Sequence, residues 1–183
     1  QRERSEFLYI SPVFDFGKRK ENKMKKESPE REPLGFDGAD ETAATILIVD
    51  DDASIRHLMG RVLAAKGYQY ATAADAAAAR ICLDNQYFEL VLSDVQMPGE
   101  SGLDLMRYIA TEYPDTAVVF ISGIDDTGIV REAIEIGAFG YIIKPFEISE
   151  VIINVINALR RRKLEISNRK QCRELESLIQ SKS

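Results

Sequence analysis

Between residues 45 and 160, short apolar runs alternate five times with segments of helical periodicity, and this alternation limits the folds open to the chain. The first run, residues 46–49, reads Ile-Leu-Ile-Val. A run without a polar position is typical of a strand buried on both faces. The later runs occupy residues 68–72, 90–93, 117–121 and 139–143. Strands separated by helices need crossover connections, so the pattern predicts an α/β fold, a doubly wound parallel sheet of five strands with helices on both faces.

The segments between these runs have the spacing of amphipathic helices. One face of the first helix carries five apolar residues that we expect in the core: Ile55, Leu58, Met59, Val62 and Leu63. Further helices are predicted over residues 74–85, 103–112 and 129–136, and from 148 onward. The last helix has an apolar face that we expect to pack on the sheet: Ile148, Ile152, Val155 and Leu159.

The chain divides into three parts. Residues 1–44 mix charge runs with proline and glycine and lack periodicity, which predicts a disordered N-terminal tail. Residues 45–160 form the predicted domain, and residues 161–183 form a helical C-terminal extension. Leu164, Leu175 and Leu178 have a spacing near that of a heptad repeat, a weak coiled-coil signal. The extension is therefore a candidate homodimerising linker, and the alternative is a solvated helix that frays.

Charge and composition exclude several classes of protein. Residues 45–147 contain 16 acidic and 7 basic residues, which disfavours nucleic-acid binding by the domain. The 23 residues after Arg160 are too few for a helix-turn-helix, so we expect no DNA-binding domain in this chain. No apolar run approaches about 18 residues, so no membrane span is expected. Two isolated cysteines, Cys82 and Cys172, indicate a reducing compartment and hence a cytoplasmic location.

Polar residues follow four of the predicted strands. The first strand ends in Asp50-Asp51-Asp52, the third in Ser93-Asp94, the fourth in Ser122 and the fifth in Lys144. The carboxyl ends of parallel strands share one edge of the sheet, so these side chains are expected to meet. Converging carboxylates repel one another unless a cation lies between them, and oxygen ligands suit Mg²⁺. A lysine and a hydroxyl beside them suit an incoming phosphoryl group.

Three segments, residues 46–52, 91–99 and 140–146, resemble the receiver domains of response regulators in two-component signal transduction. The resemblance is specific because separated motifs agree in order and spacing, with 43 residues from Asp51 to Asp94, 28 to Ser122 and 22 to Lys144. It covers residues 45 to about 160 and implies a flavodoxin-like sheet of strand order 2-1-3-4-5, as in chemotaxis regulators.

The resemblance also implies a role for each acidic residue of the site. Asp94 matches the family's phosphoacceptor, which takes a phosphoryl group from a histidine kinase or phosphotransfer protein. Asp51 matches the direct ligand of Mg²⁺ (or Mn²⁺), and Asp50 the acid that reaches the metal through water. Asp94 itself and the backbone carbonyl of Gln96 complete the expected metal ligands.

The remaining matched residues are a charge partner and a switch. Lys144 matches the lysine that pairs with the phosphoryl group, and Pro145 is expected to follow a cis peptide. Ser122 matches the hydroxyl that binds a phosphoryl oxygen, and Tyr141 the aromatic that swings inward with it. Phosphorylation is expected to switch the surface formed by the fourth helix, fifth strand and fifth helix. The resemblance therefore implies a signalling module that assists its own phosphorylation and dephosphorylation, and not a conventional enzyme.

Three other classes remain as alternatives. Asp50 and Asp52 fit the Asp-x-Asp of haloacid-dehalogenase-like phosphatases, although that reading leaves Asp94 unexplained. A flavodoxin would share the fold, but the segment after residue 49 lacks a glycine- and hydroxyl-rich phosphate cradle. A degenerate receiver that only binds partners would usually lack the acids and the lysine.

Overall fold

The computed structural model describes residues 44–123 and 127–180 of the chain. The predicted N-terminal tail lies outside the described residues except for Ala44. None of the helices in the described ranges combines the length and the apolar character that a membrane crossing requires.

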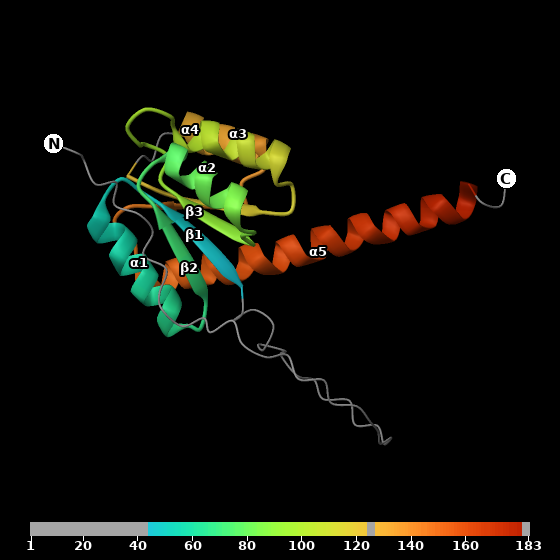
Figure 1. The fold of residues 1–183 in the computed structure, drawn as a ribbon, viewed down its shortest axis with the longest axis horizontal. Helices are drawn as coiled ribbons and strands as arrows, with labels where there is room; N and C mark the ends of the chain where they lie inside the picture. The colour runs from blue at the N-terminus through green and yellow to red at the C-terminus, as the bar shows by residue number, and fades with distance from the viewer. Residues whose placement is uncertain (1–43, 124–126, 181–183) are drawn as a thin grey trace, which may run out of the picture.

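The five predicted strands form one parallel sheet in the order β2-β1-β3-β4-β5, as expected (Figure 1). Their bounds differ from the predicted runs by at most one residue: β1 Thr45–Val49, β2 Gln69–Ala73, β3 Leu90–Ser93, β4 Ala117–Ser122 and β5 Gly140–Ile143. Every residue of β3 and β4 is buried, as a strand covered on both faces requires.

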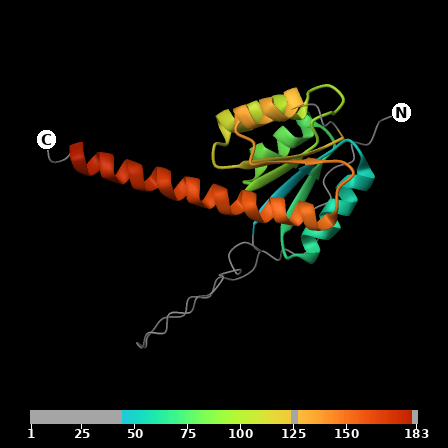
Figure 2. The ribbon, with the colours of Figure 1, turned by 180° about the vertical axis from the view of Figure 1, so that it is seen from behind.

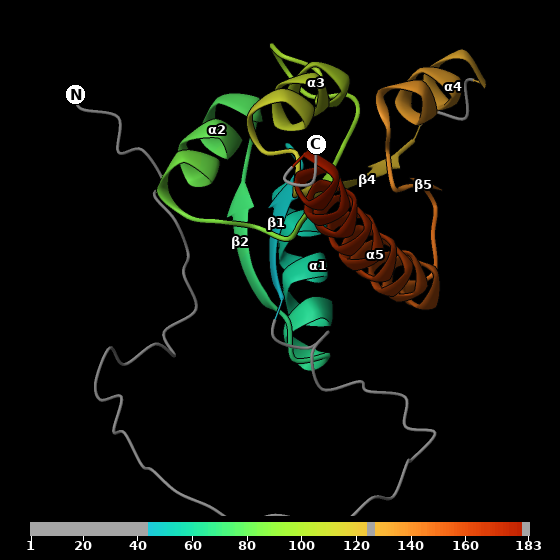
Figure 3. The same ribbon diagram turned by 90° about the vertical axis from the view of Figure 1, so that its right-hand side faces the viewer.

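Five helices follow the strands in turn: α1 Ala53–Ala65, α2 Ala76–Asn85, α3 Gly102–Glu112, α4 Thr127–Ile136 and α5 Ile148–Gln180. α1 and α5 cover one face of the sheet, and α2, α3 and α4 cover the other (Figure 3). Each of the first three helices begins at a side-chain cap, and these caps are Asp52, Asp75 and Ser101. Each cap accepts a backbone hydrogen bond that the first helical turn would otherwise leave unmade.

The core consists of two layers, one on each face of the sheet. Along β1 the side chains alternate, with Ile46 and Ile48 packed toward α1 and α5 and with Leu47 and Val49 packed toward α2 and α3. This period-two alternation places apolar side chains on both faces, so the sheet is shielded on both sides and its strands are rigidly held.

Two core predictions were wrong. Leu58 is 41 % exposed, because the buried face of α1 is centred on Met59, Gly60 and Leu63 and does not include Leu58. Ile148 is 49 % exposed, while Val151 and Val155 are fully buried. Ile148 is the first residue of α5, and the buried face of this helix is formed by Val151, Val155, Ala158 and Leu159.

Strand register brings the predicted site residues to one edge. Val49 of β1 lies beside Ser93 of β3, and Ser122 of β4 lies beside Ile143 of β5. The residues that follow these positions therefore leave the sheet together.

Gly102, the first residue of α3, lies directly against the backbone of this edge. A Cβ built on Gly102 would come 2.0 Å from the carbonyl oxygen of Asp94. We expect Gly102→Ala to lower the free energy of unfolding by about 1–3 kcal/mol, the usual cost of overpacking, despite the better helix propensity of alanine. Urea denaturation measures the change.

Gly123→Ala is the matched control, because a Cβ at Gly123 meets nothing within 4 Å. It should unfold at nearly the same urea concentration as the wild type. A Gly102→Ala protein as stable as the wild type would contradict the close approach.

Candidate functional site

Three carboxylates converge where β1 and β3 end. Asp50 and Asp51 follow β1, and Asp94 follows β3, where its amide donates to the carbonyl of Val49 (2.8 Å). One carboxylate oxygen of each residue lies within 4.8 Å of the others. Asp50 is 3 % exposed and Asp94 8 %, whereas Asp51 is exposed. The cluster therefore has two buried acids and one open to solvent.

The side chain of Lys144 joins the two buried acids. Its Nζ donates to Asp50 Oδ2 at 2.9 Å and to Asp94 Oδ2 at 2.8 Å. Lys144 comes from the end of β5, 94 residues after Asp50 and 50 after Asp94. Its own amide donates to the carbonyl of Ser122 (2.7 Å), which fixes the loop to the end of β4. The peptide bond to Pro145 is cis, as predicted.

Backbone amides orient the two buried carboxylates. The amide of Asp52 donates to Asp50 Oδ1 (2.8 Å), and the amide of Gln96 donates to Asp94 Oδ1 (3.0 Å). Each carboxylate thus has one oxygen held by an amide and the other held by Lys144. This arrangement fixes both groups without using Asp51.

Charge is only partly balanced within the cluster. Burial raises the pKa of Asp50 above its ordinary value, although the hydrogen bonds from Lys144 and the Asp52 amide act in the opposite direction. Burial also lowers the pKa of Lys144, but its hydrogen bonds to Asp94 and Asp50 outweigh this effect, so the net pKa is raised. One lysine facing three acids leaves an excess of negative charge at this edge.

The two predicted switch residues lie on neighbouring strands. Ser122 is completely buried at the end of β4. Tyr141 is half-buried in β5, and its ring centroid lies 6.1 Å from that of Phe120. Tyr141 packs against the core cluster on the α2–α4 face. The structure thus brings the predicted site residues to one edge of the sheet, except that Tyr141 pairs with Phe120, two positions before the pair of Ser122 and Ile143.

Two nearby residues were missed by the sequence analysis. Arg56 donates from Nη1 to the backbone carbonyl of Asp50 (2.6 Å), so it helps to fix the acidic loop. Arg56 lies one turn after the cap Asp52, and helical side chains point back toward the helix N-terminus, which is the signal that could have found it. Gly102 was not singled out, because nothing local to it in the sequence reveals the backbone of Asp94 nearby.

Two other polar residues near this edge lie outside the cluster. Asp52 is exposed and accepts from the amide of Ser54 (2.7 Å) as the cap of α1. This backbone hydrogen bond lowers its pKa. His57 is exposed on α1. Asp52 therefore does not belong to the carboxylate cluster, which argues against an Asp-x-Asp phosphatase.

A parallel sheet of order 2-1-3-4-5, with acids after β1 and β3 and a lysine after β5, defines the class of phosphoacceptor signalling domains. Residues 46–156 match the family model described as the response regulator receiver domain. The chain belongs to this family, so it contains a receiver domain of two-component signal transduction. The match does not support the haloacid-dehalogenase alternative.

Relatives and solved structures agree with this assignment. The chain is 31 % identical over 135 residues to the C4-dicarboxylate transport transcriptional regulatory protein DctD of Rhizobium meliloti, which covers 74 % of this chain and 29 % of DctD. It is 40 % identical over 117 residues to Protein PetR of Rhodobacter capsulatus, which covers 64 % of this chain and 48 % of PetR. A response regulator receiver domain structure from Clostridium thermocellum superposes with a TM-score of 0.62 at 32 % identity, covering 66 % of this chain and 98 % of that one. The chain thus spans less than half the length of these two curated relatives.

Removing the ammonium of Lys144 should destabilise the domain in a pH-dependent way. Its pKa is raised above the ordinary 10.5, so its stabilising effect is complete below pH 10.5 and is lost as the pH rises through the higher folded-state value. We expect Lys144→Gln to lower the free energy of unfolding by about 1–3 kcal/mol at pH 8. The deficit relative to the wild type should shrink above pH 10.5, as followed by urea denaturation.

Lys66→Gln provides the control, because Lys66 is an exposed lysine at the end of α1 without an ion pair in the described residues. That substitution should change stability by no more than about 0.5 kcal/mol. A deficit for Lys144→Gln that stays constant up to pH 11.5 would show that its ion pairs contribute nothing.

Proposed function

We propose that Asp94 is the phosphoacceptor and that a histidine kinase or phosphotransfer protein supplies the phosphoryl group. The observation that carries the proposal is the position of Lys144 Nζ, 2.8 Å from Asp94 Oδ2 and 2.9 Å from Asp50 Oδ2, beside the exposed Asp51. A carboxylate nucleophile, a cation next to it and additional acids at one sheet edge are the groups that phosphoryl transfer to a carboxylate requires.

The reaction follows from the positions of these groups. A carboxylate oxygen of Asp94 attacks the phosphorus of a phosphohistidine in line, the P–O bond forms, and the P–N bond to the imidazole breaks. Lys144 stays beside Asp94 and stabilises negative charge on the transferred oxygens. The product is an acyl phosphate, and later attack by water at phosphorus returns the carboxylate and inorganic phosphate.

The donor set fits Mg²⁺ (or Mn²⁺). Its ligands are oxygens alone, they lie within 4.8 Å of one another, and the single lysine that contacts the cluster faces three acids. We infer that Asp51 and Asp94 would hold the ion directly, with the backbone carbonyl of Gln96, and that Asp50 would contact it through water. A bound divalent ion would neutralise charge on the phosphoryl oxygens.

We propose that Ser122 and Tyr141 carry the signal away from Asp94. Ser122 is buried at the same edge, and Tyr141 lies on the neighbouring strand against Phe120. A phosphoryl oxygen that draws the Ser122 hydroxyl toward it would open space on the β4–β5 surface, into which the ring of Tyr141 turns. The surface of α4, β5 and α5 would change as a result.

The division of the chain into a receiver unit and an extension, and the role of that extension, are also proposals. The receiver unit would comprise residues 45–160 and the extension residues 161–183, with α5 continuous across the boundary. We propose that the extension joins the receiver to an output unit, because the matched regions of DctD and PetR form only part of those proteins.

We also propose a cytoplasmic location for the protein. Both described cysteines are free, which supports this location.

Phosphorylation at Asp94 is tested with acetyl phosphate as donor, in the presence and absence of Mg²⁺, and with mass spectrometry of the intact chain. The wild type should gain one phosphoryl group only with Mg²⁺, and Asp94→Asn should gain none. We expect Lys144→Gln to react about 10²–10³-fold more slowly, as for the loss of one group that stabilises developing charge. Asp51→Asn should no longer respond to Mg²⁺.

Asp52→Asn is the matched control, since asparagine is also a good helix cap and Asp52 is outside the cluster. It should be phosphorylated like the wild type. Modification that persists in Asp94→Asn and disappears in Asp52→Asn would instead support the phosphatase alternative.

A second candidate function of the chain is homodimerisation through the extension. Leu164, Leu175 and Leu178 are each more than half exposed along it. We expect the double substitution Leu175→Glu with Leu178→Glu to convert a dimer to a monomer in sedimentation velocity, with or without beryllofluoride. Ser177→Glu adds a charge on another face and should leave the dimer intact. A wild-type chain that is monomeric at all concentrations under both conditions would refute this function.

A further inference from the structure

The extension of α5 is fastened to the domain at the edge of the sheet opposite the carboxylates. Two loops form the attachment, the α2–β3 loop that contains Tyr87 and the α3–β4 loop that contains Asp115. Arg162 and Arg169 reach them from α5. We refer to Tyr87, Asp115, Arg162 and Arg169 as the clasp. Figures 1 and 2 show α5 passing this edge and continuing far beyond the domain.

Arg162 makes most of the contacts in the clasp. Its Nε donates to the carbonyl oxygen of Asp115, and its Nη2 donates to the hydroxyl of Tyr87. The guanidinium carbon lies 5.7 Å from the centroid of the Tyr87 ring. The hydroxyl of Tyr87 in turn donates to the Asp115 carbonyl (3.2 Å), so the three residues form a closed set of hydrogen bonds.

Arg169 adds an ion pair two turns further along the helix. Its Nη2 lies 2.5 Å from Asp115 Oδ1, with the two side chains 43 % and 49 % exposed. An ion pair this exposed to solvent contributes little to stability. Arg162 is half-buried and donates hydrogen bonds to neutral groups. We therefore expect Arg162 to contribute most of the attachment and Arg169 to help align the helix.

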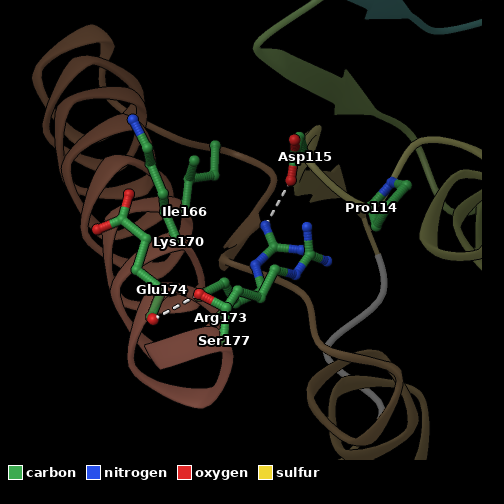
Figure 4. A pocket seen from close by; sticks show the side chains of 8 residues that line it. Pro114, Asp115, Ile166, Lys170, Arg173, Glu174 and Ser177 are labelled. Carbon is green, nitrogen blue, oxygen red and sulfur yellow. Dashed lines mark hydrogen bonds and ion pairs between the residues drawn. The ribbon is translucent and has the colours of Figure 1, made fainter. Parts of the chain in front are cut away.

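One further contact holds the start of the extension, where the guanidinium carbon of Arg161 lies 4.5 Å from the centroid of the Phe139 ring. The buried residues of α5 end at Leu159, and after it only Arg162, Glu165 and Ile166 are even half-buried in the described residues. Beside the clasp, a groove of about 600 Å³ separates the Pro114–Asp115 turn from α5. Figure 4 shows Lys170 and Glu174 on the helix side of this groove and Pro114 on the loop side. The helix is therefore not packed on the domain beyond the clasp.

The clasp also determines which face of the extension points away from the domain. Arg162 and Arg169 are seven residues apart and lie on one face, with Ile166 between them. At about 100° per residue, Leu164 and Leu175 lie about 200° and 220° around the helix from Arg162. The exposed leucines are thus directed outward while the arginines are fastened to the domain.

We propose that the clasp fixes both the direction in which α5 leaves the receiver and the face that its extension presents outward. Without it, a helix with no buried residue after Leu159 would pivot or fray at that point. The clasp makes the domain and the extension one rigid body, so that a change in the receiver can move the extension as a unit.

Electron–electron distance measurements between two spin labels test the proposal on the 183-residue chain. Cys172, exposed on the extension, takes one label, and a second is placed at the exposed position Ala64→Cys on α1. Cys82 is buried, and burial raises the pKa of its thiol, so it should stay unlabelled. Dilution with unlabelled protein restricts the signal to distances within one chain.

We expect one narrow distance distribution in the otherwise wild-type chain. Arg162→Gln should broaden it by roughly twofold or more, because a released helix samples many directions. Tyr87→Phe removes only an exposed hydroxyl, so it should fold normally, and it should broaden the distribution to a smaller extent. Circular dichroism verifies that each variant is folded.

Arg173→Gln is the matched control, with the same change in charge and length on the same helix. Arg173 is exposed and makes no ion pair or side-chain hydrogen bond with the described residues, so the distribution should stay narrow. A broad distribution without any clasp substitution, or a narrow one in both folded Arg162→Gln and Tyr87→Phe, would overturn the proposal. No phosphoryl transfer occurs in this measurement, so its outcome is independent of the role of Asp94.

Discussion

The ammonium group of Lys144 holds the site together. Two carboxylates as buried as Asp50 and Asp94 repel each other strongly in a medium of low polarity, and a single cation hydrogen-bonded to both offsets this repulsion. The contact also joins the end of β5 to the ends of β1 and β3. The remaining negative charge lies toward Asp51, the acid open to solvent. The same interaction therefore joins the strand ends and offsets the repulsion between the two buried acids.

The parallel sheet connects this site with the clasp at its other edge. β3 begins three residues after Tyr87 and ends one residue before Asp94, and β4 runs from just after Asp115 to Ser122. At about 3.3 Å per residue, these short strands span less than 25 Å. Both strands are buried throughout, and close packing makes such elements stiff. The site and the extension are thus attached to opposite ends of the same rigid elements.

Local sequence pattern predicted the strands, the helices and the acids, because each leaves a signal within a few residues. The failures concern positions whose environment is set by distant parts of the chain. Leu58 matches the helical period but lies outside the face that packs on the sheet, and Ile148 likewise lies outside the buried residues of α5, which begin at Val151. Arg56 and Gly102 have no motif, because their partners are backbone atoms near Asp50 and Asp94.

The sequence by itself determined the fold class, the family and the identity of the acids and lysine, since apolar periodicity and motif spacing are properties of the chain in order. Only the tertiary structure decided which oxygens Lys144 contacts, how deeply each acid is buried, and that Arg162 and Arg169 meet Tyr87 and Asp115. The physical reason is that ion pairs and hydrogen bonds depend on distances of a few ångströms between residues many positions apart. Such distances are set by how the strands and helices pack, and no short stretch of sequence contains them.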